Sequence, residues 1–264
     1  MDRLRLLSYN IQAGIASVRY RDYFANSWKH LLPHRARMTN LSRISEMLGG
    51  YDVVGLQEVD AGSLRSAFVD QTEYLARISG YPHWYRQINR DLGTLAQHSN
   101  GVLSRLRPKM IRDHKLPGLP GRGVLLSEFQ TSGGGLLAVC VVHLALGARA
   151  RRRQLEFLRE LTGQYSCAVL MGDFNSGCGS GALRALVDRA GWHGLDCERK
   201  TFPSWRPMHN LDHILVSANI EILNAQVVDY ALSDHLPISM DIRLPSGIEP
   251  CEPVVEPLPG PGVI

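Results

Sequence analysis

Short apolar runs that stop abruptly at a polar residue recur along this chain. An apolar run of about four to eight residues indicates a buried strand, and turn residues or polar residues mark its end. The pattern predicts strands at residues 4–9, 52–57, 101–104, 124–129, 136–142, 167–170, 211–216 and 238–242. Residues 131–135 are Thr-Ser-Gly-Gly-Gly, so we expect the strands on either side of them to form a hairpin.

Apolar residues at helical spacing fill several of the segments between these strands. Leu41, Ile44 and Leu48 share one face of a helix that Thr39 or Asn40 would cap. Further helices are expected at about 71–79, 148–162 and 181–190, and a glycine follows each of them. Strands interspersed with helices indicate an α/β fold.

A single large domain accounts for most of the chain. A length of 264 residues is compatible with one α/β domain and a sizeable core, and we place this domain at residues 1–244. From residue 245 to residue 264 prolines recur without apolar periodicity. Such a segment buries too little apolar surface to fold, so we expect a disordered tail.

Composition excludes several classes of protein. The net charge of +4 permits a polyanionic partner without requiring one. Five cysteines without a Cys-x-x-Cys pair indicate neither a disulfide framework nor a zinc site. The chain enters a strand pattern at once, without a signal-peptide core, and no apolar run approaches the ~20 residues of a membrane span. We therefore expect a cytoplasmic protein without membrane insertion, and the sequence indicates no protein partner.

The segment Met-Gly-Asp-Phe-Asn-Ser at residues 171–176 ends one of the apolar runs. Because side chains alternate along a strand, Asp173 and Asn175 point one way and Phe174 points into the core. The carboxylate and the amide then reach the same cavity. A turn closed by Asx-type hydrogen bonds explains an isolated Gly-Asp-Phe-Asn about equally well, so the functional interpretation depends on the other strand ends.

Other predicted strands end in the same kind of residue. The polar residues that follow or lie on apolar segments are Asn10, Glu58, His143, Asp173, Asn175, Asp212, Asp234 and His235. Asp212 and His213 are neighbours in one strand, so at most one of them faces this site. Carboxylates in one cavity repel one another and raise each other's pKa, and a divalent cation removes the conflict. Oxygen ligands without cysteine favour Mg²⁺ or Mn²⁺ over zinc.

This set of side chains suits phosphoester hydrolysis. Cleaving a phosphate ester requires a barrier reduction on the order of 20 kcal/mol, of which general base catalysis supplies only about 3 to 5 kcal/mol. The rest must come from positioning and from fixed positive charge on the phosphoryl oxygens. A metal ion and two histidines provide that charge, whereas a site with bases and no cation does not.

Two basic stretches bear on the choice of substrate. Residues 13–39 interleave basic and aromatic residues, as nucleic-acid-binding surfaces do, but we weight a solvated insertion about two to one over that role. The predicted helix at 148–162 carries Arg149 and the arginines at 151–153. Glu156 offsets part of their charge, so a solvated helix face is the safer interpretation.

Seven short blocks complete the pattern. In chain order they are Leu-Ser-Tyr-Asn-Ile (7–11), Gly-Leu-Gln-Glu-Val-Asp (55–60), Ser-Asn-Gly-Val-Leu-Ser-Arg (99–105), Val-His-Leu (142–144), Gly-Asp-Phe-Asn (172–175), Leu-Asp-His-Ile-Leu (211–215) and Ser-Asp-His-Leu-Pro (233–237). Together they resemble the ordered motifs of the endonuclease/exonuclease/phosphatase superfamily, the deoxyribonuclease I-like fold, and its uncharacterised bacterial members. The resemblance implies a four-layered α/β sandwich, with two packed mixed β-sheets flanked by helices.

The resemblance also implies which residues bind the metal and the attacking water. Glu58 matches the principal metal ligand, Asn10 helps to hold the metal or phosphate, and Asp234 resembles a second carboxylate on the metal side. Asp173 matches the acid that orients or deprotonates water. Asn175 matches the amide that contacts the phosphate.

The histidines and the substrate border complete the expected site. His235, held by Asp212, matches the histidine that stabilises the phosphoryl transition state. His143 matches a histidine of many members, which the repair-type apurinic endonucleases usually lack. We expect substrate contacts from Asn100, and from Trp205 and Arg206 in a block shared with uncharacterised bacterial members. For Trp205, plain packing is favoured about three to two.

The sequence thus predicts a Mg²⁺- or Mn²⁺-dependent hydrolase that uses water for in-line attack on a phosphodiester, with DNA or RNA as the expected substrate. Phospholipid headgroups, inositol phosphates and other small phosphoesters are the alternative, because the shared residues hold only the phosphate. A non-catalytic scaffold is disfavoured by the intact set of acids, amides and histidines. A calcineurin-type phosphoesterase needs Asp-x-His and Gly-Asn-His blocks, which this chain lacks.

Overall fold

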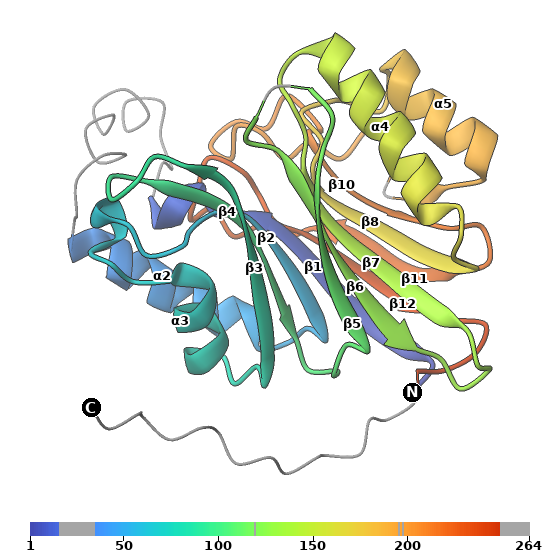
Figure 1. The fold of residues 1–264 in the computed structure, drawn as a ribbon, viewed down its shortest axis with the longest axis horizontal. Helices are drawn as coiled ribbons and strands as arrows, with labels where there is room; N and C mark the ends of the chain where they lie inside the picture. Colours follow the sequence, from blue (N-terminus) through green and yellow to red (C-terminus); the bar gives the residue numbers. More distant parts are fainter. Residues whose placement is uncertain (16–34, 119, 195, 197, 249–264) are drawn as a thin grey trace.

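Two six-stranded sheets form the centre of the protein (Figure 1). The computed structural model describes residues 1–15, 35–118, 120–194, 196 and 198–248. The first sheet has the order β11 (Glu221–Val227), β12 (Ile238–Arg243), β1 (Arg3–Asn10), β2 (Val53–Asp60), β4 (Gln97–Ser104) and β3 (His83–Asp91). The second has the order β5 (Met110–Lys115), β6 (Gly123–Gln130), β7 (Leu136–His143), β8 (Cys167–Asp173), β10 (Asp212–Val216) and β9 (His193–Gly194). The pairs β1–β2 and β7–β8 are parallel and the others antiparallel.

Helices cover the outer face of each sheet (Figure 1). Helices α2 (Arg35–Leu48) and α3 (Gln71–Ile78) pack on the first sheet, and α4 (Ala148–Thr162) and α5 (Gly181–Ala190) pack on the second. Two short 3₁₀ turns, η1 (Gln12–Gly14) and η3 (Leu64–Ser66), follow β1 and β2. The predicted four-layered α/β sandwich with two mixed sheets is therefore confirmed.

Side-chain alternation along the central strands divides the core into three clusters. In β1, Leu4 and Leu6 point between the sheets, whereas Leu7 points toward α2. The sheets pack tightly against each other at Gly55, where an added Cβ would lie 2.9 Å from the Met171 Cε and from a Val141 methyl group. Because both faces of these strands are buried, their sequences read as continuous apolar runs.

Four strands were not predicted, namely β3, β5, β9 and β11. Strands β5 and β11 contain only exposed and half-buried residues, and all four lie at the edge of a sheet. An edge strand with a solvated face does not carry a continuous apolar run, so the pattern that revealed the central strands is missing there.

The start of α2 was also predicted wrongly. Thr39 and Asn40 were expected to cap the helix, but it already includes Arg35, which places both residues inside it. The Asn40 side chain is buried and donates hydrogen bonds to the carbonyl oxygens of Gly14 (3.2 Å) and Leu232 (2.8 Å). The Asn40 amide therefore links the helix to the segments that contain Gly14 and Leu232, and it does not cap the helix.

The chain beyond residue 244 still packs against the domain for a few residues. Ile248 is 3% exposed and donates its backbone N–H to the Met1 carbonyl oxygen. The remainder of the expected tail, and residues 16–34 of the basic and aromatic stretch, lie outside the described residues. Within the described residues, no helix is long and apolar enough to cross a membrane.

The cysteines differ from expectation at one position. Cys140 and Cys167 are buried and free. Cys178, however, is disulfide-bonded. The sequence-based expectation excluded a disulfide framework and did not anticipate this individual bond, because a cysteine count without Cys-x-x-Cys carries no information about distant pairs.

Candidate active site

Strand register alone brings three of the predicted polar residues together. In the parallel pair β7–β8, His143 lies opposite Asp173, and in the antiparallel pair β8–β10, Asp212 lies opposite Asp173. Asp173 is therefore flanked by a histidine and a second carboxylate on neighbouring strands of one sheet. All three side chains are buried.

A glycine makes the end of β8 possible. Gly172 has a φ of +149°, and an added Cβ would overlap the carbonyl oxygen of Val142 on the neighbouring strand. No residue with a side chain fits at this position. This steric requirement explains the glycine before Asp173, and it sets the direction in which the strand delivers its carboxylate.

Asn10 connects the two sheets at the centre of the site. Its amide nitrogen lies 3.2 Å from the Asp173 Oδ2 and 3.3 Å from the Glu58 Oε1. Asp173 belongs to the second sheet, whereas Asn10 and Glu58 belong to the first. The backbone N–H of Asn175 donates to the other Asp173 oxygen at 2.8 Å. Both carboxylate oxygens of Asp173 are thus held in place.

Glu58 reaches the site through an irregularity in β2. Between the pairs Leu56–Gly101 and Val59–Ser99, two residues of β2 oppose only Asn100 of β4. Glu58 is one of the two and has a φ of +55°. A bulge of this kind redirects a side chain, and a positive φ at a residue other than glycine is typical of functional positions.

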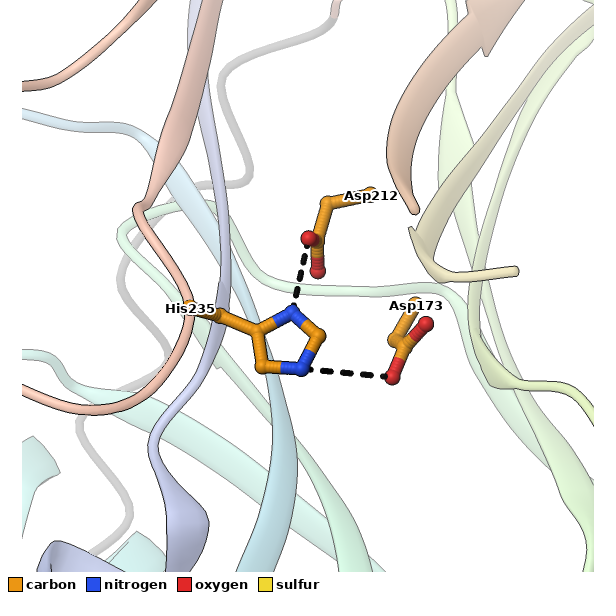
Figure 2. A group of neighbouring side chains, drawn as sticks. All are labelled: Asp173, Asp212 and His235. Carbon is orange, nitrogen blue, oxygen red and sulfur yellow. Dashed lines mark hydrogen bonds and ion pairs between the residues drawn. The ribbon is translucent and has the colours of Figure 1, made fainter. Parts of the chain in front are cut away.

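The most strongly connected pair in the site is His235 and Asp212 (Figure 2). His235 Nδ1 lies 2.8 Å from Asp212 Oδ2, and His235 Nε2 lies 3.9 Å from Asp173 Oδ2. The Thr201 hydroxyl donates to the same Asp212 oxygen at 2.5 Å. On its other side the imidazole packs on Phe202, with 4.8 Å between ring centroids. The ring is therefore fixed in both orientation and tautomer.

The prediction that only one residue of the Asp212–His213 pair faces the site is confirmed. Asp212 contacts His235. His213 instead interacts with the Ser176 carbonyl oxygen at 2.7 Å and packs edge-on against Phe174. The alternation along β10 that separates them is the ordinary geometry of a strand.

The two site histidines carry different charges. Burial lowers the pKa of His235, but the hydrogen-bonded Asp212 carboxylate outweighs this and raises that pKa to about 10. His143 lies 3.4 Å from Asp173 and 3.9 Å from Glu58. Burial and the nearby Arg122 lower the pKa of His143 to about 3. At neutral pH the site therefore contains one imidazolium and one neutral imidazole.

The carboxyl groups of the site also differ from one another in pKa. Burial raises the pKa of Asp173 to about 7 and that of Asp234 to about 6. For Glu58 burial acts in the same direction, but His143, His235 and the Asn10 amide bring its pKa below the ordinary value. Titratable groups whose environments shift their pKa values apart are characteristic of acid–base sites.

The remaining predicted residues are placed as follows. Asn100 lines a cavity beside Glu58 and His143, and its amide nitrogen lies 3.2 Å from the Gly123 carbonyl oxygen. The Asn175 amide nitrogen donates to the Leu144 carbonyl oxygen at 2.9 Å, so in this arrangement it holds a loop. Trp205 is half-buried and Arg206 exposed, and neither lines that cavity. Their substrate contacts stay predictions.

Sequence reasoning missed four residues near the site. Thr201 and Phe202 belong to the block in which we singled out Trp205 and Arg206, and they make the contacts with Asp212 and His235 described above. Arg90 and Arg122 line the cavity beside Glu58. The sequence offered a signal for Thr201 and Phe202, because their block precedes the strand that carries Asp212. The two arginines lie in an unpredicted strand and a surface loop, where no pattern marked them.

The donor set fits a hard divalent cation. Asp234 Oδ1 and Asp212 Oδ1 are buried without a hydrogen-bond partner among the described residues, and such oxygens favour a bound cation. Asp173, Asp212 and His235 offer ligand atoms within 4.8 Å of one another, but the hydrogen bond from His235 already occupies one Asp212 oxygen. The carboxylates and the amide carry oxygen donors, which Mg²⁺ and Mn²⁺ prefer.

Comparison with known structures places this fold among solved relatives. A structure from Beutenbergia cavernae DSM 12333, described as an endonuclease/exonuclease/phosphatase, is 20% identical, with a TM-score of 0.71 over 92% of this chain and 72% of that one. The mannosyl-6-phosphatase Bt3783 of Bacteroides thetaiotaomicron VPI-5482 is 18% identical, with a TM-score of 0.66 over 90% and 99%. The human Nocturnin catalytic domain with bound sulfate is 17% identical, with a TM-score of 0.65 over 91% and 93%. At these identities the similarity establishes the fold.

Sequence comparison identifies the family. We find no curated protein with significant similarity to the chain. Residues 7–235 match the profile of the Endonuclease/Exonuclease/phosphatase family, a range that begins at the first predicted motif and ends at His235. With its two sheets and its buried cluster of acids and histidines, the chain therefore belongs to the Endonuclease/Exonuclease/phosphatase family, whose fold is typically that of phosphoester hydrolases.

Proposed function

We propose that this protein hydrolyses phosphoesters with water and a divalent metal ion. The observation that carries the proposal is the pairing of Asp173, whose pKa is raised to about 7, with a His235 imidazolium 3.9 Å away. A base that titrates near neutral pH next to a fixed positive charge suits a reaction in which water loses a proton while phosphoryl oxygens gain charge.

Glu58, Asn10 and Asp234 would hold the metal ion, Mg²⁺ or Mn²⁺. Asn10 already bonds to the Glu58 carboxylate, and the Ser233 hydroxyl donates to the Asn10 carbonyl oxygen at 2.6 Å. This bond fixes the turn that carries Asp234 against the end of β1. When bound, the ion would neutralise charge on the phosphoryl oxygens.

The protein's own groups account for the proton transfers. Asp173 would take the proton of the attacking water as the new oxygen–phosphorus bond forms. The bond from phosphorus to the ester oxygen then breaks, and that oxygen accepts a proton from His235 Nε2–H. Asp212 keeps the imidazole oriented through its hydrogen bond to His235 Nδ1. His143, neutral and close to both Asp173 and Glu58, would donate or accept a hydrogen bond without adding charge.

The substrate class is a separate question. Cleavage of DNA or RNA stays our sequence-based prediction, and it requires cations along the backbone of the polymer. On α4, however, the Arg151 guanidinium is turned back onto the carbonyl oxygens of Ala145 and Leu146, and Arg159 pairs with Glu156. Because Arg151 and Arg159 already interact with partners inside the protein, α4 is less suited to bind the phosphates of a nucleic acid. A small phosphoester is the second candidate, favoured by the cavity beside Glu58.

The test is hydrolysis of bis-p-nitrophenyl phosphate with and without Mg²⁺. We expect metal-dependent release of nitrophenol that is lost in Glu58→Ala and His235→Ala, with thermal unfolding to show that both variants are folded. Arg184→Met, at an exposed position on α5, is the matched control and should keep the wild-type rate. Equal rates in the wild type and both alanine variants would reject the proposed site.

A further inference from the structure

A cavity lined by two arginines lies beside the candidate active site. It has a volume of about 230 Å³, and its lining includes Glu58 and His143. Ligand pockets for drug-sized molecules occupy ~300–1,000 Å³, so this one suits a small group. Its polar lining includes Asn89, Arg90, His98, Asn100 and Arg122.

The two arginines come from different sheets. Arg90 lies near the end of β3 in the first sheet, and Arg122 directly precedes β6 in the second. Gly121, whose φ is +102°, holds them close. An added Cβ there would lie 3.4 Å from the Arg90 Cβ, so the loop backbone rests against the Arg90 side chain. The loop therefore places Arg122 near Arg90, so that both arginines line the same cavity.

Neither the Arg90 nor the Arg122 guanidinium forms a salt bridge among the described residues. Arg122 is only half-exposed, and burial together with Arg90 lowers its pKa, while Glu58 and Asp173 act in the opposite direction. The cavity lining thus contains two arginines and one carboxylate, Glu58, which the proposed metal ion would occupy. A ligand anion would offset the remaining positive charge.

The histidine in this cavity does not supply the anion-binding charge. Burial and the neighbouring Arg65 lower the pKa of His98 to about 4, so His98 is neutral at physiological pH. Asn100, which also lines the cavity, donates a hydrogen bond to the Gly123 carbonyl oxygen of the second sheet. The positive charge of the cavity therefore belongs to Arg90 and Arg122.

We infer that this cavity is a subsite for a second anionic group of the substrate, so that the enzyme acts on small phosphoesters with a further phosphate or carboxylate about one sugar ring from the scissile phosphate. The inference rests on the proposed function, because it takes the scissile phosphate to lie at Glu58, Asp173 and His235. Arg90 and Arg122 would then determine specificity by forming charge-assisted hydrogen bonds with the second anion.

The test compares two ligands that differ by one phosphate. Isothermal titration would measure the binding of glucose 1,6-bisphosphate and of glucose 6-phosphate to the full chain, in EDTA so that neither is hydrolysed. Hydrogen bonds to charged groups contribute ~1.5–3 kcal/mol, so we expect the bisphosphate to bind at least about tenfold more tightly. Arg122→Met and Arg90→Met should each lose most of this preference, and Arg184→Met should keep it.

Each outcome decides a different claim. Equal binding of the two sugar phosphates to the wild type, or a preference that survives in both folded arginine variants, would overturn the inference. A 12-nucleotide single-stranded DNA that binds more tightly than the bisphosphate, through the same two arginines, would overturn it in favour of a polymer. Because the titration needs no turnover, its failure is distinguishable from a failure to hydrolyse bis-p-nitrophenyl phosphate.

Discussion

His235 donates its Nδ1 proton to Asp212 at 2.8 Å and directs Nε2 toward Asp173, so a single ring connects two carboxyl groups, of which Asp173 titrates near neutral pH. The two aspartates are direct cross-strand neighbours in β8 and β10. The imidazolium between them allows both to occupy one buried site. Removing one member of this trio alters the electrostatic environment of the other two.

The first prediction concerns this ring. In the metal-free protein the pKa of His235 is about 10, whereas the ordinary histidine value is ~6.5. Asp212→Asn removes the main cause of the increase, so the pKa should fall toward the ordinary value. NMR titration of the imidazole resonances checks this. In the activity assay the variant should lose rate as pH rises from 6 to 8, while the wild type retains its imidazolium, and a His235 pKa unchanged by Asp212→Asn would contradict the assignment.

The second prediction concerns metal dependence. Glu58→Gln removes a carboxylate from the proposed metal ligands but keeps its size and its backbone conformation. We expect Mn²⁺ binding, measured by titration calorimetry, to weaken at least about tenfold, since metal ligands and their partners each contribute ~10–100-fold in affinity. EDTA should abolish wild-type hydrolysis and added Mg²⁺ should restore it. Glu46→Gln, at an exposed position on α2, should leave Mn²⁺ affinity unchanged; equal affinities in both variants would exclude Glu58.

The third prediction concerns the glycine before Asp173. A methyl group at Gly172 would overlap the Val142 carbonyl oxygen, so Gly172→Ala must displace two central strands. We expect a loss of at least about 3 kcal/mol in the free energy of unfolding, as for other overpacked or strained core positions. Gly179→Ala is the control, because no atom lies within 4 Å of its added Cβ. Urea denaturation curves that coincide for the two variants would refute the steric argument.

The fourth prediction concerns acid stability. Asp60 accepts hydrogen bonds from Ser63, Ser66 and the buried Arg65, and these outweigh its burial and lower its pKa to about 2. Since the folded pKa is below the unfolded value of ~3.9, the stabilisation is fully present above that value and is lost as pH falls toward 2. Asp60→Asn should cost about 3–5 kcal/mol at pH 7, because it leaves the Arg65 charge buried and unpaired.

Urea unfolding at pH 7 and at pH 3 measures that effect. The difference between the wild type and Asp60→Asn should shrink at pH 3, because the Asp60 carboxyl group of the unfolded chain, with a pKa of ~3.9, is then largely protonated. Asp188→Asn, at an exposed position on α5, should match the wild type at both values. A difference that does not vary with pH would show that the hydrogen bonds, and not the charge of Asp60, provide the stabilisation.

The sequence predicted the central part of the fold because burial on both faces leaves a direct signal. Helix α5 was predicted with its exact bounds, since Gly191 adopts a left-handed conformation at its C-terminus and an apolar face precedes it. The edge strands β5 and β11 were missed because solvent covers one of their faces. The motifs located the polar strand ends, but only the register shows that His143, Asp173 and Asp212 are adjacent.

Prediction from the sequence was least successful around the cavity. Arg90 and Arg122 lie 32 positions apart in the sequence, in a hairpin and a loop, and only the packing of the two sheets brings them together. The bulge that orients Glu58 was also invisible, because β2 reads as an uninterrupted strand. Long-range contacts of this kind depend on tertiary structure and leave no local pattern.

The cavity walls come from two separate sheets, so the segments that would select a ligand are distinct from the strands that carry the acids. The tip of one hairpin and the loop before β6 can exchange residues without disturbing the interior strands that carry Asp173 and His143. Under the proposed function, substitutions in these two surface segments would alter which molecule is recognised and leave the reaction itself unchanged.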